Sequence, residues 1–212
     1  MSPTARRARL TPEERREQLL ALGVRLLGSR QLDELSIDLL AEEAGISRGL
    51  LYHYFGGKHD FHVAVVERAA REIFEATAPS GEGEPLDQML GAMRVYVAYV
   101  CANHTGYASL VRAARGGSDE LRGVYERARG DLTDRIFAAG RGGLAELGIR
   151  DTSASRRMAK AWASMAEDAV LDWVADPDGV SEDDLIGALT GALWAALSAL
   201  PSTGDAGTDL EP

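Results

Sequence analysis

Residues 36–61, SIDLLAEEAGISRGLLYHYFGGKHDF, decide the predicted fold. Two short helical segments, at 36–43 and 47–55, flank the turn Ala44-Gly45-Ile46, and Gly45 supplies the unusual backbone dihedral that such a turn needs. The side chains placed where two crossed helices must meet are apolar or small, namely Leu40, Ala41, Ala44, Ile46, Leu51 and Tyr54. The spacing predicts a helix-turn-helix, which can place its second helix in the major groove of DNA. An ordinary helical hairpin inside a bundle is the alternative.

The second helix of this motif contains the main candidate DNA contacts. Ser47, Arg48 and Gly49 open that helix, and its first turn penetrates deepest into the groove. The Arg48 guanidinium can bond O6 and N7 of guanine together, which is worth about 1–3 kcal/mol of base discrimination. A solvated arginine at a helix start is the alternative. Gly49 lets the backbone approach the duplex closely.

Further candidate contacts follow one turn later. Tyr52 and His53 project from the same exposed face and are expected to touch phosphates or bases, whereas Tyr54 and Phe55 are expected to close the small core. Lys58 begins the next helix. Its ammonium and the free backbone N–H groups beside it therefore predict a phosphate-binding position.

Capping signals predict helices on both sides of the motif. Thr11-Pro12-Glu13-Glu14 offers an N-cap, a proline at the first helical position and a capping-box glutamate, so a helix is expected to about Leu27. Further helices are expected at 58–76, 86–103, 106–115, 118–147, 153–175 and 181–200. No stretch suggests a sheet, and the chain is 45% hydrophobic but only 6% aromatic, a mixture that favours helices. The predicted fold class is all-α.

The net charge of −10 is distributed unevenly along the 212 residues. Residues 1–60 hold 9 Lys and Arg against 9 Asp and Glu, so the acidity belongs to the C-terminal part. Arg48 and Lys58 bracket the second helix, and Arg6, Arg7 and Arg9 cluster in the leader. The field near the motif can therefore be locally positive, as contact with phosphates requires.

Several classes of protein lack support in the sequence. No stretch approaches the ~18 uncharged apolar residues of a membrane span, and no apolar signal-peptide segment is present, so we expect a cytoplasmic protein without a membrane partner. The single cysteine, Cys101, excludes an internal disulfide, and the scattered histidines form no metal-ligand cluster. Without a nucleophile–base pair or cofactor loop, we expect no enzymatic activity, no cofactor and no metal.

The stretch at 36–61 resembles the N-terminal signature of the TetR family of bacterial regulators. The resemblance covers about residues 12–75, roughly a third of the chain, and the rest matches only in length and helical content. It implies an N-terminal three-helix DNA-binding domain, a larger helical domain for a small effector, and a homodimer that usually acts as a repressor released by ligand. Leu50, where similar sequences usually have Thr, and Ser36 complete the candidate DNA contacts.

Proline and glycine near residue 80 mark the clearest linker and place a domain boundary there. The predicted organisation has five parts. They are a flexible basic arm at 1–10, a helix-turn-helix domain at 11–57, a connecting helix at 58–78, an effector-binding and dimerisation domain at 79–200, and a disordered tail at 201–212.

The C-terminal part offers candidates for an effector pocket. Residues 95–101 are apolar all round a helix, so this segment is expected to lie centrally in the larger domain. Met and aromatic side chains fill irregular volumes and accommodate apolar ligands, but core packing without a cavity is the alternative for each. The candidate ligand contacts are Met89, Met93, Tyr96, Tyr99, His104, Tyr107, Phe137, Trp162 and Met165, with Arg112, Glu167 and Asp168 as further polar candidates.

The last predicted helix looks buried on two sides, so one side needs a partner chain. One stripe is Leu185, Leu189, Leu193, Leu197 and Leu200, and the other is Gly187, Gly191, Trp194 and Ser198. The preceding helix, with Val170, Leu171, Trp173 and Val174, is expected to complete a four-helix interface. A twofold dimer places two DNA-binding motifs about 34–36 Å apart, or a multiple of that, which suits a palindromic operator in double-stranded DNA.

These patterns together predict a dimeric DNA-binding transcription regulator, a repressor whose operator binding is relieved by a small-molecule effector. The alternative is a DNA-binding dimer of the same fold whose C-terminal domain binds a protein partner or only dimerises.

Overall fold

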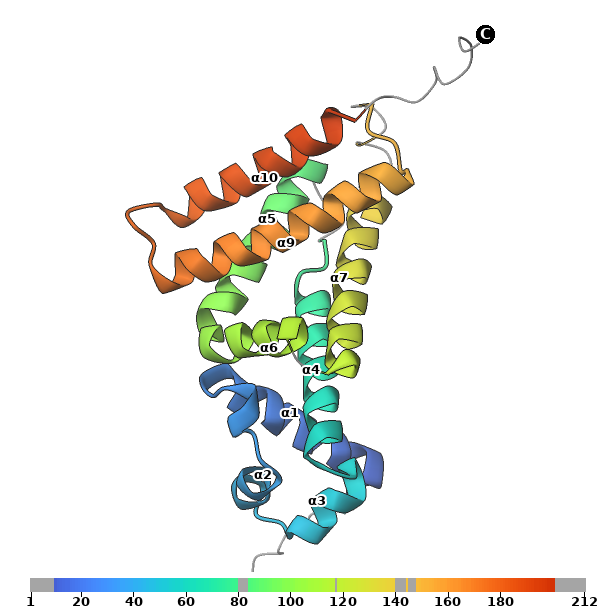
Figure 1. Cartoon of the computed structure of the whole chain (residues 1–212), viewed down its shortest axis with the longest axis vertical. Helices are drawn as coiled ribbons and strands as arrows, with labels where there is room; N and C mark the ends of the chain where they lie inside the picture. The colour runs from blue at the N-terminus through green and yellow to red at the C-terminus, as the bar shows by residue number, and fades with distance from the viewer. Residues whose placement is uncertain (1–9, 80–83, 117, 140–143, 145–147, 201–212) are drawn as a thin grey trace, which may run out of the picture. The chain divides into compact units, whose positions relative to one another are not determined.

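The computed structural model describes residues 10–79, 84–116, 118–139, 144 and 148–200, and Figure 1 shows their path. All regular secondary structure in these ranges is helical, and no strand occurs among them. The all-α prediction is therefore confirmed. The predicted flexible arm at 1–10, apart from Leu10, and the predicted disordered tail at 201–212 lie outside the described residues.

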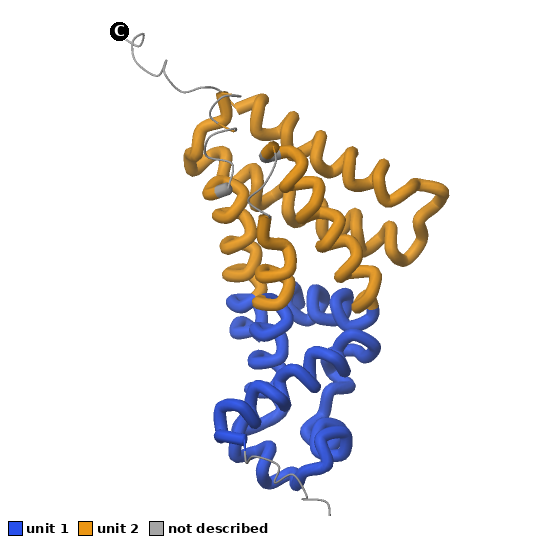
Figure 2. Tube along the Cα trace, turned by 180° about the vertical axis from the view of Figure 1, so that it is seen from behind, with its two compact units in different colours: residues 1–70, 105–124 blue, residues 71–104, 125–212 orange. Residues whose placement is uncertain are grey.

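The chain divides into two compact units, coloured separately in Figure 2. Unit 1 comprises residues 1–70 and 105–124, and unit 2 comprises residues 71–104 and 125–212. Helices α4 (Lys58–Ala76) and α7 (Asp119–Ala139) each begin in unit 1 and end in unit 2. Both units thus combine segments that are distant in the sequence, whereas the predicted domains are continuous stretches. The division of the chain by function stays a prediction.

Helix α1 (Pro12–Ser29) opens unit 1 with the predicted capping box. The Thr11 side chain accepts a hydrogen bond from the Glu14 N–H at 3.2 Å, and the Glu14 carboxylate accepts one from the Thr11 N–H at 2.8 Å. Gly23 faces α4, where an added Cβ would lie 2.6 Å from Val65 Cγ2. Because Gly23 has no side chain, α1 and α4 pack closely around a core that includes Leu19, Leu27, Leu35, Leu40, Leu51, Phe61 and Val65.

In the sequence, the helix-turn-helix follows α1 and precedes α4. A 3-10 turn, η1 (Leu32–Glu34), leads into α2 (Ile37–Ala44), and α3 (Arg48–Phe55) packs against α2. Gly45 adopts φ 64° and ψ 36°, which is the left-handed conformation that favours glycine. The Gly45 N–H donates to Glu42 at 3.2 Å and the Ile46 N–H to Ala41 at 3.1 Å, a Schellman closure made by backbone atoms. The predicted motif and its turn are confirmed.

Helix α6 (His104–Gly116) belongs almost entirely to unit 1 and packs tightly on α1. At Gly106 an added Cβ would lie 1.6 Å from the Leu27 carbonyl oxygen, so no side chain fits there. One turn later, Ser109 Oγ accepts a hydrogen bond from the Leu32 N–H at 2.9 Å and donates to the Gly106 carbonyl at 2.8 Å. These contacts fix α6 against the segment that leads into the helix-turn-helix.

Unit 2 is built on α5 (Pro85–Ala102), α9 (Ser153–Ala175) and α10 (Glu182–Ser198), which pack on one another. Trp162 on α9 donates its indole N–H to the Leu189 carbonyl at 2.8 Å. The buried side chains of this unit include Val97, Val100, Val170, Ile186 and Leu193. Arg135 on α7 closes the C-terminal end of α4. Its guanidinium donates to the Phe74 carbonyl and to Thr77 Oγ1, and it lies 4.1 Å from the centre of the Phe74 ring.

Most predicted helix boundaries agree with the structure to within two residues. Helix α7 ends at Ala139, and most of its predicted extension to 147 lies outside the described residues. The 3-10 turn at Leu32–Glu34 was not predicted, because a single short turn leaves no apolar periodicity.

Gly106→Ala is expected to lower the free energy of unfolding by about 3 kcal/mol, because a methyl group cannot be accommodated against the Leu27 backbone without moving α6. Gly130→Ala on α7 is the matched control. An added Cβ there meets nothing within 4 Å, so the change should be neutral or stabilise the helix by up to about 1 kcal/mol. Urea unfolding followed by circular dichroism measures both values. Equal stability of the two variants would contradict the close contact at Gly106.

Candidate nucleic-acid interface

Helix α3 is anchored by two buried side chains and exposes most of its other residues. Leu51 and Phe55 are buried, and the Phe55 ring meets Phe61 edge-on at 5.2 Å between centroids. Tyr52 is 52% exposed, and Leu50 and His53 are exposed beside it. Arg16 on α1 lies over the Phe55 ring, 5.4 Å from its centre. The predicted burial of Phe55 is confirmed, and Tyr54 is half-buried. An eight-residue helix is thereby held with one face free.

Ser36 and Ser47 serve as N-caps, as their positions predicted. Ser36 Oγ accepts a hydrogen bond from the Leu39 N–H at 3.0 Å, and Ser47 Oγ accepts one from the Leu50 N–H at 3.3 Å. Each hydroxyl keeps its own O–H as a donor. A DNA contact by either serine therefore stays a prediction, and it is compatible with the capping role.

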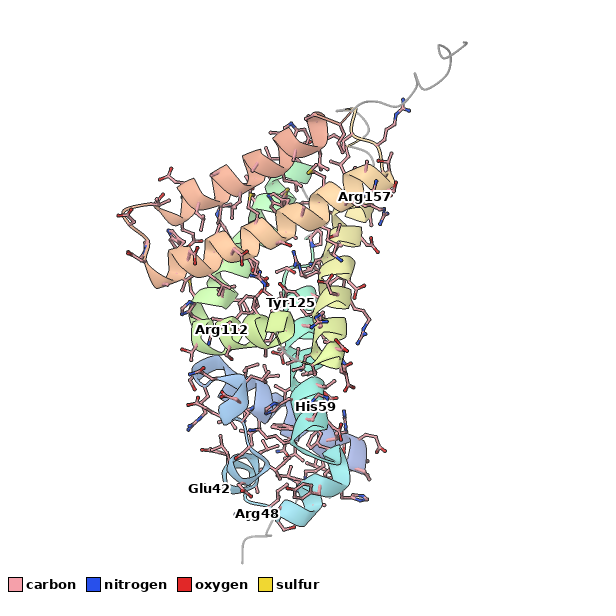
Figure 3. The ribbon with its side chains drawn as sticks, in the orientation of Figure 1. Glu42, Arg48, His59, Arg112, Tyr125 and Arg157 are labelled. Atoms are coloured by element: carbon pink, nitrogen blue, oxygen red, sulfur yellow. The ribbon has the colours of Figure 1, made fainter. Side chains whose placement is uncertain are left out.

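Arg48 lies at the first position of α3 and forms an ion pair that the sequence did not predict. Its Nε lies 2.5 Å from Oδ1 of Asp38 on α2, with 70% of the arginine side chain and 60% of the aspartate side chain exposed. Figure 3 labels Arg48 at the end of unit 1 that α2 and α3 form. In the sequence, only the opposite charges of Asp38 and Arg48 indicate that these two residues could pair. Residues ten apart on two helices are brought together only by the fold.

Gly49 has no structural reason to be glycine in the free chain. An added Cβ would meet nothing within 4 Å, and the residue lies in regular helix. The open space beside Gly49 is where a DNA backbone would lie if α3 entered a groove. Folding alone therefore does not account for the absent side chain.

Lys58 has a backbone partner in the free chain. Its Nζ donates to the Asp33 carbonyl at 2.6 Å, which ties the start of α4 to η1. An ammonium has three donors, so this bond leaves capacity for a phosphate. The predicted phosphate contact is untested, and Lys58 also has a structural role that the sequence did not reveal.

Two histidines at the start of α4 connect neighbouring elements of unit 1. His59 Nε2 lies 2.8 Å from a Glu120 carboxylate oxygen, and His62 Nε2 donates to the Leu35 carbonyl at 2.7 Å. Burial lowers the pKa of His62 from its ordinary value of 6.5. Nearby Lys58 and His59 add to the lowering, whereas the Leu35 hydrogen bond and Asp33 oppose it.

The excess of acidic over basic residues lies in unit 2. By sequence, unit 1 contains 13 Lys and Arg against 12 Asp and Glu, and unit 2 contains 10 against 21. The sequence predicts that the acidic excess lies away from the helix-turn-helix, and the excess falls in the unit that does not contain this motif. The unit with α3 is close to neutral, so a few exposed cations can set the local field.

The predicted ligand contacts fall in different environments. Met93, Phe137 and Trp162 are buried in unit 2, and Met89, Tyr96, Tyr99 and His104 are half-buried there. Burial, followed by the Glu72 carboxylate, raises the pKa of Tyr99 to about 12. Tyr107 belongs to unit 1, and Met165 is 46% exposed on α9, which favours a surface role for that side chain.

A buried polar cluster connects α7 and α9 within unit 2. The Tyr125 hydroxyl donates to the Glu167 carboxylate, and both residues are buried. Arg129 donates to the Tyr125 hydroxyl at 3.3 Å, to the Lys160 carbonyl at 3.1 Å and to Ser164 Oγ. Of the further polar candidates, Glu167 is the one that lies in the core, while Asp168 beside it is exposed. Tyr125 and Arg129 were not singled out, because the sequence gives no sign of which face of α7 is covered.

The described residues contain neither a candidate membrane span nor a candidate metal site. No helix there is long and apolar enough to cross a membrane. The described residues also include no group of three or more His, Cys, Asp or Glu side chains that could hold a metal ion.

A helix-turn-helix with an exposed second helix, where the other described elements are also helical, defines a class of DNA-binding transcription regulators. Residues 19–65 match the model for bacterial regulatory proteins of the tetR family, and residues 85–196 match that of the tetracyclin repressor-like C-terminal domain. The chain therefore belongs to the tetR family of bacterial transcription regulators.

Individual relatives agree with this assignment. A tetR-family regulator from Streptomyces coelicolor has a similar structure, with a TM-score of 0.74 and 28% identity over 88% of this chain and 82% of that one. An uncharacterized HTH-type regulator of Mycobacterium tuberculosis is 28% identical over 80% of this chain and 72% of its own. The HTH-type regulator BetI of Vibrio parahaemolyticus is 36% identical over 73 residues, so the match spans about a third of that protein's length.

The lowered pKa of His62 predicts a pH-dependent stability. The unfolded chain binds this proton more readily than the folded chain, so the contribution is complete above pH 6.5 and is lost as the pH falls below it. His62→Gln keeps a donor for the Leu35 carbonyl but cannot titrate, so its urea stability should decrease less between pH 7.5 and 5.5. The exposed His53, changed to Gln in the same way, controls for the substitution. A wild-type pH profile in His62→Gln would rule out this role.

Proposed function

We propose that the chain is a repressor that binds a palindromic operator as a homodimer and releases it when a small-molecule effector binds. Ligand-responsive repression is typical of the family. The observation that most directly supports DNA binding is the exposure of Arg48, Gly49 and Tyr52 on a helix anchored by Leu51 and Phe55. A repressor of this kind catalyses no reaction. It acts in the cytoplasm, because bacterial operators are there.

Sequence discrimination is assigned to the first turn of α3. Arg48 bonds the major-groove edge of guanine, Gly49 gives the sugar-phosphate backbone room, and Tyr52 and His53 contact phosphates or bases one turn later. Lys58 adds a sequence-independent phosphate contact. Ser36, Ser47 and Leu50 border the same surface and complete the interface.

Dimerisation is assigned to the outer face of α9 and α10, which comprises Met158, Met165, Gly187, Gly191, Trp194 and Ser198. All six residues are exposed in the single chain, and Trp194 is 36% exposed. Small residues let a partner helix approach, and a large aromatic side chain supplies an anchor. The earlier expectation for Val170 is wrong, because that side chain is fully buried in the core of its own unit and cannot reach a partner.

Effector release requires that the ligand bind one conformation of the dimer better than the DNA-bound one. The half-buried and buried candidates on α5, α7 and α9 in unit 2 are the proposed contacts: Met89, Met93, Tyr96, Tyr99, His104, Phe137 and Trp162. Helix α4 passes from unit 1 into unit 2 and is the covalent element most suited to transmit the change. Selection of bound fragments from random DNA, with and without metabolite extract, tests operator and effector together. An operator that no extract displaces would favour a C-terminal domain that only dimerises or binds a protein.

Arg48→Ala should reduce the preference for the selected operator over random DNA by about 1–3 kcal/mol, because one bidentate guanine contact is lost. Lys58→Ala should weaken binding to both duplexes alike and make the salt dependence shallower by about one unit. Lys160→Ala, which removes the only other lysine, is the control and should change neither quantity. Fluorescence anisotropy over a range of salt concentrations measures all three. Equal losses of Arg48→Ala on both duplexes would contradict base recognition.

Trp194→Glu should shift the chain toward monomer and weaken operator binding, because each monomer then holds only one half-site. Leu86→Glu introduces the same charge at an exposed apolar residue of α5, outside the proposed face, and should leave the dimer intact. Sedimentation velocity gives the oligomeric state of both variants. A wild-type sedimentation profile for Trp194→Glu would place the interface elsewhere.

A further inference from the structure

We propose that Asp38 is a positioning residue that makes Arg48 selective for a base edge over a phosphate. This inference deepens the proposed function, because it concerns how the DNA-contacting arginine is held. Asp38 is the second residue of α2, and Arg48 is the first residue of α3. Their side chains meet across the turn, with Nε and Oδ1 2.5 Å apart.

The ion pair contributes little to holding the motif together. Both side chains are largely exposed, at 60% and 70%, and exposed ion pairs contribute little to stability. Helices α2 and α3 are already joined by the buried Leu40 and Leu51 and by the backbone closure around Gly45. The contact between Asp38 and Arg48 therefore affects the arginine more than the fold.

The geometry leaves one edge of the guanidinium for DNA. Arginine has five N–H donors in a planar fork, and the carboxylate contacts the fork at Nε. The opposite edge, with the two terminal nitrogens, matches O6 and N7 of guanine. An arginine fixed at Nε loses less side-chain freedom when it bonds the base, which favours the bound geometry.

The charge of Asp38 also acts on the competing target. A phosphate approaching Arg48 carries a full negative charge and meets the carboxylate beside the guanidinium, so the two anions repel. Guanine is uncharged and does not suffer this repulsion. Asp38 therefore weakens phosphate contacts of Arg48 at random sites while it permits the guanine contact at the operator.

Asp38→Asn in the full-length chain tests this inference against a matched control. Glu42 lies one turn after Asp38 on the same face of α2, and Figure 3 labels Glu42 and Arg48 at the same end of unit 1. Glu42→Gln removes the same charge without removing the ion-pair partner of Arg48. Binding is measured by anisotropy on the selected operator and on a random duplex of equal length, over a range of salt concentrations.

We expect Asp38→Asn to lower the ratio of operator to random affinity roughly two- to fivefold, as loss of an exposed ion pair implies. The change should come from tighter binding to random DNA, with a salt slope steeper by about one unit, because Arg48 becomes free to contact a phosphate. Asp38→Glu keeps a carboxylate within reach of Nε and should restore the wild-type slope. Glu42→Gln should leave the ratio unchanged.

Three outcomes would overturn the role of Asp38. The first is the same ratio of operator to random affinity for Asp38→Asn as for Glu42→Gln. The second is a further decrease of this ratio when Asp38→Asn is added to Arg48→Ala, because Asp38 is proposed to act only through Arg48. In both cases base recognition by Arg48 still stands if Arg48→Ala lowers the ratio. The third is an unchanged ratio in Arg48→Ala, which would remove the proposed base contact together with its positioning residue.

Discussion

Two buried side chains, Leu51 and Phe55, determine what α3 can present. A helix of eight residues is too short to persist in water without tertiary contacts, so its conformation depends on packing against α2 and Phe61. With 3.6 residues per turn, burying positions 51 and 55 turns Gly49 and His53 to the opposite face, and Arg48 is exposed because it opens the helix. The burial of Leu51 and Phe55 thus determines which side chains of α3 are exposed.

The sequence predicts this local architecture well because the signals involved are local. Thr11, Ser36 and Ser47 each cap the helix that follows, and Gly45 takes the left-handed turn, because the bonds concerned span only a few residues. The position of α6 in unit 1 could not be predicted in this way. It depends on the fit of Gly106 to the Leu27 carbonyl, and a glycine within a helix gives no indication of what lies opposite.

Side-chain partners between elements were the least predictable feature. Arg48 with Asp38, and Lys58 with the Asp33 carbonyl, join residues whose proximity follows only from the tertiary structure. In unit 2 the apolar pattern gave Trp162, Phe137 and Met165 the same candidate role, although the first two are buried and Met165 is exposed. It also gave no sign that Val170 is covered by its own unit. The hydropathy of an apolar residue is the same whether its side chain faces a neighbouring helix of its own chain or solvent.

The location of the net negative charge in unit 2 affects how the chain approaches a nucleic acid. With 21 acidic residues against 10 basic ones, unit 2 is repelled by the phosphate backbone, while the nearly neutral unit 1 is not. Collisions that bring unit 2 toward the duplex are therefore disfavoured before contact. Dissolved salt screens this long-range repulsion as well as the short-range attraction. The association rate should consequently depend less steeply on ionic strength than the number of cations at the interface alone would indicate.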